Sequence, residues 1–139
     1  MQIKRSILVV DDDQYLLSAI GQTLMLNGYH DDLQASPLTA LEMVNNSSYM
    51  AVIADIRMPV MDGMQLLTAI GDLDRDLPMI MITGQGDVAP AVQAIRAGAY
   101  DFLEKPVDEE VLLASLKRAV EKRQLILENR ERRIRLCDP

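Results

Sequence analysis

Apolar residues fall into two patterns that alternate along the chain. Short continuous apolar runs occur, such as SILVV at 6–10 and PMIMIT at 78–83. Between them lie longer segments in which apolar residues recur every three or four positions. The continuous runs are typical of strands buried on both faces of a sheet, and the spaced pattern is typical of helices with one buried side. The chain is therefore predicted to alternate strands with helices.

This alternation predicts the fold class. Strands are expected at 6–10, 29–35, 49–54, 78–83 and 99–104, of which the second is a polar edge strand. Helices are expected at 14–27, 36–44, 64–70, 87–97 and 108–135, with Gly28 and Gly98 as stop signals. Five such pairs predict an α/β protein with a doubly wound, five-stranded parallel sheet and an extended C-terminal helix.

Chemically active side chains stand where the predicted strands end. The first strand runs into three acids, and three later strands end at an acid, a hydroxyl and a base: Asp11, Asp12, Asp13, Asp55, Thr83 and Lys105. Because the carboxyl ends of parallel strands meet at one edge of a sheet, these groups are expected to converge there.

Carboxylates crowded at one sheet edge raise each other's proton affinity unless a cation neutralises them. Mg²⁺ is the natural cation, since it binds oxygen ligands and commonly uses one or two carboxylates with phosphate oxygens. A carboxylate can also accept a phosphoryl group, whose charge a lysine and a hydroxyl would balance. Each residue alone has a plainer interpretation, and for Asp13, which stands directly before a predicted helix, we expect that interpretation to hold: it should cap the helix. Their coincidence at strand ends favours a site.

With their surrounding motifs, these residues resemble the receiver domain of two-component response regulators. The matching elements are Asp11-Asp12, Asp55 within DIRMPVMDG, Thr83 in ITG and Lys105-Pro106, in order over about residues 4–121. The segment TGQGDVAPAVQAIRAGAYDFLEKP looks most like receivers of the nitrogen-regulatory and dicarboxylate-transport type of transcriptional activator. The resemblance implies a flavodoxin-like (βα)5 fold.

The resemblance assigns roles to the acidic residues. Asp55 would be the phosphoacceptor. Asp12 would ligate Mg²⁺ directly and Asp11 mainly through bound water, while Asp55 and the backbone carbonyl of Arg57 would complete the protein ligands. Arg57 and Gln85 would flank the path of attacking water and tune the lifetime of the phosphoryl group. No organic cofactor is expected.

The resemblance also assigns a switch. Lys105 would pair with the acceptor or the phosphoryl group, Thr83 would swing toward a phosphoryl oxygen, and Phe102 would follow it inward. A cis peptide bond is implied at Lys105–Pro106. Two positions depart from the family pattern: Val60 stands where Gly often follows the acceptor-loop Pro, and Phe102 lacks the hydroxyl of the Tyr found in many receivers. Apart from its own phosphorylation and dephosphorylation, the chain is expected not to be an enzyme.

A phosphatase of the haloacid-dehalogenase type is the main alternative. It too has an apolar strand ending in Asp-x-Asp, here Asp11 and Asp13, followed by a Thr on a strand and a Lys. Asp11 would then be the nucleophile. Against it, a helix is predicted after Lys105 in place of a strand with acidic ligands, and Asp55 would have no role. A receiver-like module that never takes phosphate is disfavoured by the complete set of groups.

The C-terminal helix is predicted to extend beyond the sheet. Five-residue strands span about 17 Å, whereas a helix over 108–135 spans about 40 Å. Apolar residues recur with a spacing of seven at Leu113, Val120, Leu127 and Ile134, and Arg123 and Arg130 make the second position of this seam imperfect. Two interpretations stay open, a fraying charged end and a dimerising linker. We expect a receiver domain at 1–121 and a linker helix extension at 122–139.

Charge and composition bound the remaining possibilities. Residues 1–116 hold 6 Lys/Arg and 17 Asp/Glu, a net of −11, while residues 117–139 hold 8 and 4, a net of +4. The basic tail has no helix-turn-helix and no interleaved aromatics, so direct nucleic-acid binding by this fragment is not expected. No apolar run matches a membrane span or a secretory signal, and the single Cys137 fits a reducing compartment.

These observations, with the resemblance, imply the biological setting. We expect a cytoplasmic protein without a membrane segment, phosphorylated by a sensor histidine kinase. It would form a homodimer through the fourth helix, fifth strand and fifth helix, through the linker helix, or through both. It would control transcription through an output domain absent from this chain.

Overall fold

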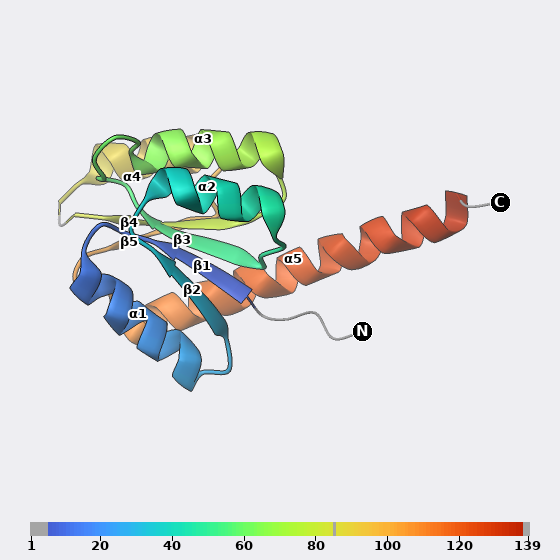
Figure 1. The fold of residues 1–139 in the computed structure, drawn as a ribbon, viewed down its shortest axis with the longest axis horizontal. Coiled ribbons are helices and arrows are strands. Elements are labelled where there is room, and N and C mark those ends of the chain that lie inside the picture. Colours follow the sequence, from blue (N-terminus) through green and yellow to red (C-terminus); the bar gives the residue numbers. More distant parts are fainter. Residues whose placement is uncertain (1–5, 85, 138–139) are drawn as a thin grey trace.

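All five predicted strands and all five predicted helices are present in the computed structural model, which describes residues 6–84 and 86–137 (Figure 1). The strands are β1 (Ser6–Val10), β2 (His30–Gln34), β3 (Ala51–Asp55), β4 (Met79–Thr83) and β5 (Asp101–Glu104). The helices are α1 (Gln14–Leu26), α2 (Pro37–Asn46), α3 (Gly63–Leu73), α4 (Val88–Arg96) and α5 (Glu109–Cys137). The predicted alternation is therefore confirmed, with boundaries shifted by a few residues.

The strands form one parallel sheet in the order β2-β1-β3-β4-β5. Strand β1 lies between β2 and β3, so the direction of winding reverses there, and ligand sites of such sheets form at the carboxyl ends beside this point. The register pairs Val10 of β1 with Ala54 of β3. Asp11 and Asp55, which follow these two residues, therefore leave the sheet side by side.

Helices cover both faces of the sheet (Figure 1). Helices α1 and α5 pack on one face, around side chains such as Ile7 and Ile53, and α2, α3 and α4 pack on the other, around Leu8 and Val52. Strands β1, β3 and β4 are buried along their whole length, which accounts for their continuous apolar runs. The polar β2 lies at an edge, as predicted, where its charges discourage pairing with other chains.

Helix α5 is longer than the sheet that it covers. Its first half packs on the sheet through Leu112, Leu116 and Val120, which are buried. Its second half extends past the body of the protein (Figure 1), and the helix continues without a break through the predicted domain boundary at residue 121. Within the described ranges, none of the helices combines the length and the apolar character needed to span a bilayer.

Helix α3 begins against the end of β3 because of a capping box and a glycine. The Asp62 carboxylate accepts a hydrogen bond from the Gln65 N–H (2.9 Å), and the Gln65 side chain accepts one from the Asp62 N–H (3.0 Å). The next residue, Gly63, lies so close to β3 that a Cβ atom there would come within 2.4 Å of the Asp55 carbonyl oxygen and 2.6 Å of the Ile56 Cα. Only glycine fits this approach.

Replacing this glycine is expected to destabilise the fold. Gly63→Ala should lower the free energy of unfolding by about 1–3 kcal/mol, because the added methyl group overpacks against backbone atoms that cannot move aside. Gly71→Ala is the matched control in the same helix, where an added Cβ meets nothing within 4 Å. It should raise the free energy of unfolding by roughly 0.5–1 kcal/mol. Urea titrations followed by circular dichroism measure both, and similar shifts for the two variants would contradict this account.

Candidate functional site

Three carboxylates meet at the carboxyl edge of the sheet, as the sequence predicts. Asp11 and Asp12 follow β1, and Asp55 is the last residue of β3. Each offers an oxygen atom, and these atoms all lie within 4.8 Å of one another. Asp11 and Asp55 are buried, whereas Asp12 is exposed. Two buried acids and one exposed acid thus form a concentrated negative site that opens to solvent on one side.

Asp11 is the most confined of the three, with 1% of its surface exposed. Its Oδ1 accepts a hydrogen bond from the Asp13 N–H (2.9 Å), but its Oδ2 is buried and has no hydrogen-bond partner among the described residues. Burial raises the pKa of Asp11 to about 6; the charge of Asp55 adds to this rise, while the Asp13 N–H and the Lys105 charge oppose it. A buried carboxylate oxygen without a partner is costly, and a cation ligated by oxygen atoms would satisfy it.

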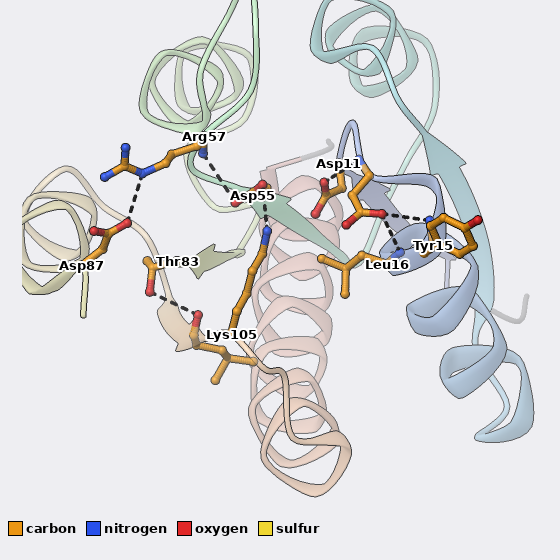
Figure 2. A network of polar contacts seen from close by, with 10 residues as sticks. Asp11, Tyr15, Leu16, Asp55, Arg57, Thr83, Asp87 and Lys105 are labelled. Atoms are coloured by element: carbon orange, nitrogen blue, oxygen red, sulfur yellow. Dashed lines mark hydrogen bonds and ion pairs between the residues drawn. The ribbon is translucent and has the colours of Figure 1, made fainter. Parts of the chain in front are cut away.

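Lys105 reaches the same site from the other side. Its Nζ lies 3.2 Å from Asp55 Oδ2 (Figure 2). Burial lowers the pKa of Lys105, but the charge of Asp55 and the hydrogen bond to it outweigh burial, so the pKa is raised. The residue follows β5, and the peptide bond to Pro106 is cis, as the sequence analysis expects. A cation that stays protonated therefore contacts the acceptor candidate directly.

Thr83 and Phe102 lie on the neighbouring strands. The Thr83 side chain is buried, and its Oγ1 donates a hydrogen bond to the Leu103 carbonyl oxygen (3.4 Å) rather than to Asp55 (Figure 2). Phe102 is 39% exposed on β5. In this arrangement the hydroxyl is engaged within the sheet, and the aromatic ring is partly in solvent.

The loop after β3 is tied to the start of α4. The Arg57 N–H donates to Asp55 Oδ1 (3.4 Å), while the guanidinium points away from Asp55 and its Nε lies 3.0 Å from Asp87 Oδ2 (Figure 2). Asp87 stands at the N-cap position of α4 but makes no capping hydrogen bond there. Asp87 was not among the predicted site residues, because no local motif marks a pairing between residues so far apart. Gln85, the second residue expected to tune the site, lies outside the described residues.

The third acid after β1 has a structural task. Asp13 is the N-cap of α1, and its Oδ1 accepts hydrogen bonds from the N–H groups of Tyr15 (3.0 Å) and Leu16 (3.3 Å). This confirms that Asp13 caps α1, as expected. Because its carboxylate is engaged in capping, Asp13 is poorly suited to be the second acid of a phosphatase site. After Lys105 the chain forms α5, as predicted, and not a strand with further acids. Both features weigh against the phosphatase alternative.

Val60 in the acceptor loop adopts a backbone conformation that suits glycine. Its φ is 71°, in the left-handed region, and its side chain is 87% exposed. A β-branched residue with this backbone is an outlier, since its Cβ crowds the following carbonyl oxygen. Val60 stands where Gly is frequent in the family, and its positive φ supplies the physical reason.

Comparison with known proteins gives one consistent result. The sequence model of the response regulator receiver domain family matches residues 7–117. The C4-dicarboxylate transport transcriptional regulatory protein DctD of Pseudomonas aeruginosa is 46% identical over 136 residues, which cover 95% of this chain and 29% of that protein. DctD of Rhizobium meliloti is 47% identical over 133 residues, which cover 96% and 29%. The chain thus spans less than a third of these relatives.

Solved structures show the same similarity. A response regulator receiver domain protein from Clostridium thermocellum superposes with a TM-score of 0.83 at 31% identity, covering 87% of this chain and 98% of the other. NtrX from Brucella abortus superposes with a TM-score of 0.85 at 34% identity, covering 93% of this chain and 29% of the other. The predicted flavodoxin-like fold is confirmed, and the haloacid-dehalogenase alternative finds no support.

The buried Asp11 predicts an unusual dependence of stability on pH. Its folded-state pKa of about 6 lies above its ordinary value of 3.8, so the folded protein binds more protons than the unfolded chain between these values. The contribution of Asp11 to stability should therefore fall, by on the order of 2 kcal/mol, as the pH rises from about 4 to about 6 without divalent cations. Asp11→Asn removes this contribution. Denaturation of both proteins in chelator-treated buffer measures it, and a difference that stays constant with pH would contradict the prediction.

The strained Val60 predicts a stabilising substitution. Val60→Asn should raise the free energy of unfolding by about 1 kcal/mol, because asparagine tolerates the left-handed backbone far better than a β-branched residue. Val111→Asn is the control, since Val111 is 51% exposed within α5 and the two residue types have similar helix propensities. Thermal and urea unfolding measure both variants. A loss of stability in Val60→Asn would show that the loop conformation is not strained.

Proposed function

This chain belongs to the response regulator receiver domain family, and we propose that Asp55 is its phosphoacceptor. The observation that carries the proposal is the contact of Lys105 Nζ with Asp55 Oδ2 at 3.2 Å, beside the acids Asp11 and Asp12. One oxygen of Asp55 would attack the phosphorus of a phosphohistidine. A phosphorus–oxygen bond forms as the phosphorus–nitrogen bond breaks, and the imidazole nitrogen keeps the electron pair and takes up a proton.

Mg²⁺ is the cation that this proposal requires. Asp11, Asp12, Asp55 and the backbone carbonyl of Arg57 would hold it, with Asp12 as a direct ligand and Asp11 acting mainly through water. Two observations support the fit of this site to Mg²⁺. All of these donors are hard oxygen atoms, and Asp11 Oδ2 is buried without a partner among the described residues. When bound, the ion would offset the charge of the acidic group and of the phosphoryl oxygens. Lys105 would balance the same charge from the other side.

The response to phosphorylation would start at Thr83. To reach a phosphoryl oxygen on Asp55, its hydroxyl must leave the Leu103 carbonyl oxygen. The space that the hydroxyl leaves beside β5 would then favour an inward position of Phe102, whose side chain is partly in solvent before the change. Because Phe102 has no hydroxyl, its inward position would be held by packing alone. The surface of α4, β5 and α5 would change with it.

Family membership also supports the wider setting. A sensor histidine kinase would supply the phosphoryl group in the cytoplasm, and apart from its own phosphorylation and dephosphorylation the chain would have no enzymatic activity. The similarity to transcriptional regulators more than three times its length supports control of transcription by an output domain that follows a linker at 122–139. A homodimer through α4, β5 and α5, or through the linker, would carry the signal, and this fragment would not bind nucleic acid itself.

Phosphorylation of the isolated chain tests the acceptor. Incubation with a small phosphodonor such as acetyl phosphate and Mg²⁺ should add one phosphoryl group, measured by intact mass. Asp55→Asn should abolish labelling, because the amide is not a competent nucleophile, and chelation of Mg²⁺ should reduce it by at least tenfold.

Asp13→Asn is the matched control, since asparagine keeps the cap of α1 while removing one carboxylate from the same edge. It should label like the parent. Labelling of Asp55→Asn at the parent rate would overturn the assignment. Steady turnover of a phosphatase substrate that survives loss of Asp55 but not of Asp11 would instead revive the alternative chemistry.

A further inference from the structure

Arg123 connects the projecting helix to the body of the protein. Although it lies on the half of α5 that leaves the sheet, only 3% of its surface is exposed. Its Nη2 donates to Asp74 Oδ2 (2.6 Å), and its Nε donates to the Tyr49 carbonyl oxygen (3.3 Å). Its Nη1 is buried without a hydrogen-bond partner in the described part of the chain. The buried charge of Arg123 is therefore balanced by Asp74.

Arg130 repeats this contact two turns further along the helix. Its Nη2 donates to the second oxygen of Asp74, Oδ1 (3.2 Å), and to Asp76 Oδ2. Burial opposes ionisation of Asp74, but its hydrogen bonds and the charge of Arg123 outweigh burial and lower the pKa of Asp74. One carboxylate thus joins two arginines of α5, and Asp76 supports the second.

The acidic pair, Asp74 and Asp76, is already ordered by its own loop. Asp74 follows the last residue of α3, and its Oδ1 accepts a hydrogen bond from the Asp76 N–H (3.1 Å). Both residues precede β4, and Tyr49 precedes β3. They therefore lie at the amino edge of the sheet, opposite the edge that carries Asp55.

The contacts of α5 follow a single stripe. Leu116 and Val120 are buried on the sheet, Arg123 and Arg130 meet the acidic pair, and Leu127 packs against the same core cluster as Val120. Four of these residues belong to the imperfect seam for a second helix that the sequence predicts: Val120, Arg123, Leu127 and Arg130. In the structure these residues contact their own chain as far as residue 130, whereas pairing of two linker helices stays a prediction; the side chain of Ile134 lies outside the described part.

We propose that the acidic pair is a docking point for the C-terminal helix of its own chain, and that this docking excludes a second copy from the stripe. The linker would leave the receiver as a rigid helix whose direction is fixed by Asp74 and Asp76. A dimer that pairs the linker helices along this stripe would form only when Arg123 and Arg130 are released. This competition between docking and pairing rests on the proposed role of the linker in dimerisation and makes that role more specific. The docking itself needs no phosphoryl group.

Hydrogen exchange of the unphosphorylated chain tests the docking. Asp74→Asn should accelerate amide exchange in residues 121–132 by at least tenfold, because it leaves the Arg123 charge buried and uncompensated. Asp76→Asn should accelerate exchange less, and mainly around Arg130. Asp72→Asn is the matched control: it removes the same charge from an exposed position on α3 that takes no part in these contacts, and it should change nothing.

Exchange in β3 and β4 reports whether each variant stays folded. If Asp74→Asn unfolds the domain, Asp76→Asn decides the question, since its contact with the exposed Arg130 is not part of the core. Unchanged exchange around Arg130 in a folded Asp76→Asn protein would overturn the docking.

Sedimentation velocity tests the competition. The folded acidic-pair variants should dimerise at a concentration at least tenfold lower than the parent and Asp72→Asn. Unchanged association in a variant whose helix is released would overturn the competition. Both measurements are made without a phosphodonor, so failure of Asp55 to accept a phosphoryl group would not affect them.

Discussion

The structure is organised around the repulsion between carboxylates that the sheet forces together. The register of β1 and β3 places Asp11 beside Asp55, and burial of both strands prevents the two residues from moving apart. Lys105 supplies one positive charge to the site, and it contacts Asp55 rather than Asp11 Oδ2, which has no hydrogen-bond partner among the described residues. Within the part of the chain that the structure describes, the negative charge of this site is thus balanced only in part. A site of this kind attracts cations without a dedicated cage, because the rigid sheet has already brought the ligands together.

Sequence patterns predicted the local features of this protein well. The continuous apolar runs located β1, β3 and β4, because strands covered on both faces bury every side chain. Asp13 was assigned as a cap from its place before a helical segment, and the topology of parallel sheets then brought Asp11, Asp55, Thr83 and Lys105 to one edge. Each of these predictions depends on neighbours in the sequence or on a general rule of chain connection.

Contacts between distant segments were not predictable in this way. Nothing near Arg57 marks Asp87 as its partner, and nothing near Arg123 marks Asp74. The spacing of seven along α5 correctly indicated one contacting stripe, but periodicity reveals which side of a helix is covered and not what covers it. The two arginines were therefore interpreted as imperfections of a seam for a second helix, whereas in the structure both pair with Asp74 of their own chain. Similarly, the exposed Val60 shows its strain only through its backbone angle.

The continuity of α5 has a geometric consequence for anything joined to it. Each residue of an α-helix turns the chain by about 100° and advances it by about 1.5 Å. From Arg130, which contacts the acidic pair, the helix continues to Cys137. Adding or deleting one residue in this stretch would rotate an attached domain about the helix axis to a different side of the receiver. Adding or deleting seven residues would nearly restore its original orientation. The number of residues in the linker would then determine the direction in which the attached domain faces, and not only its distance from the receiver.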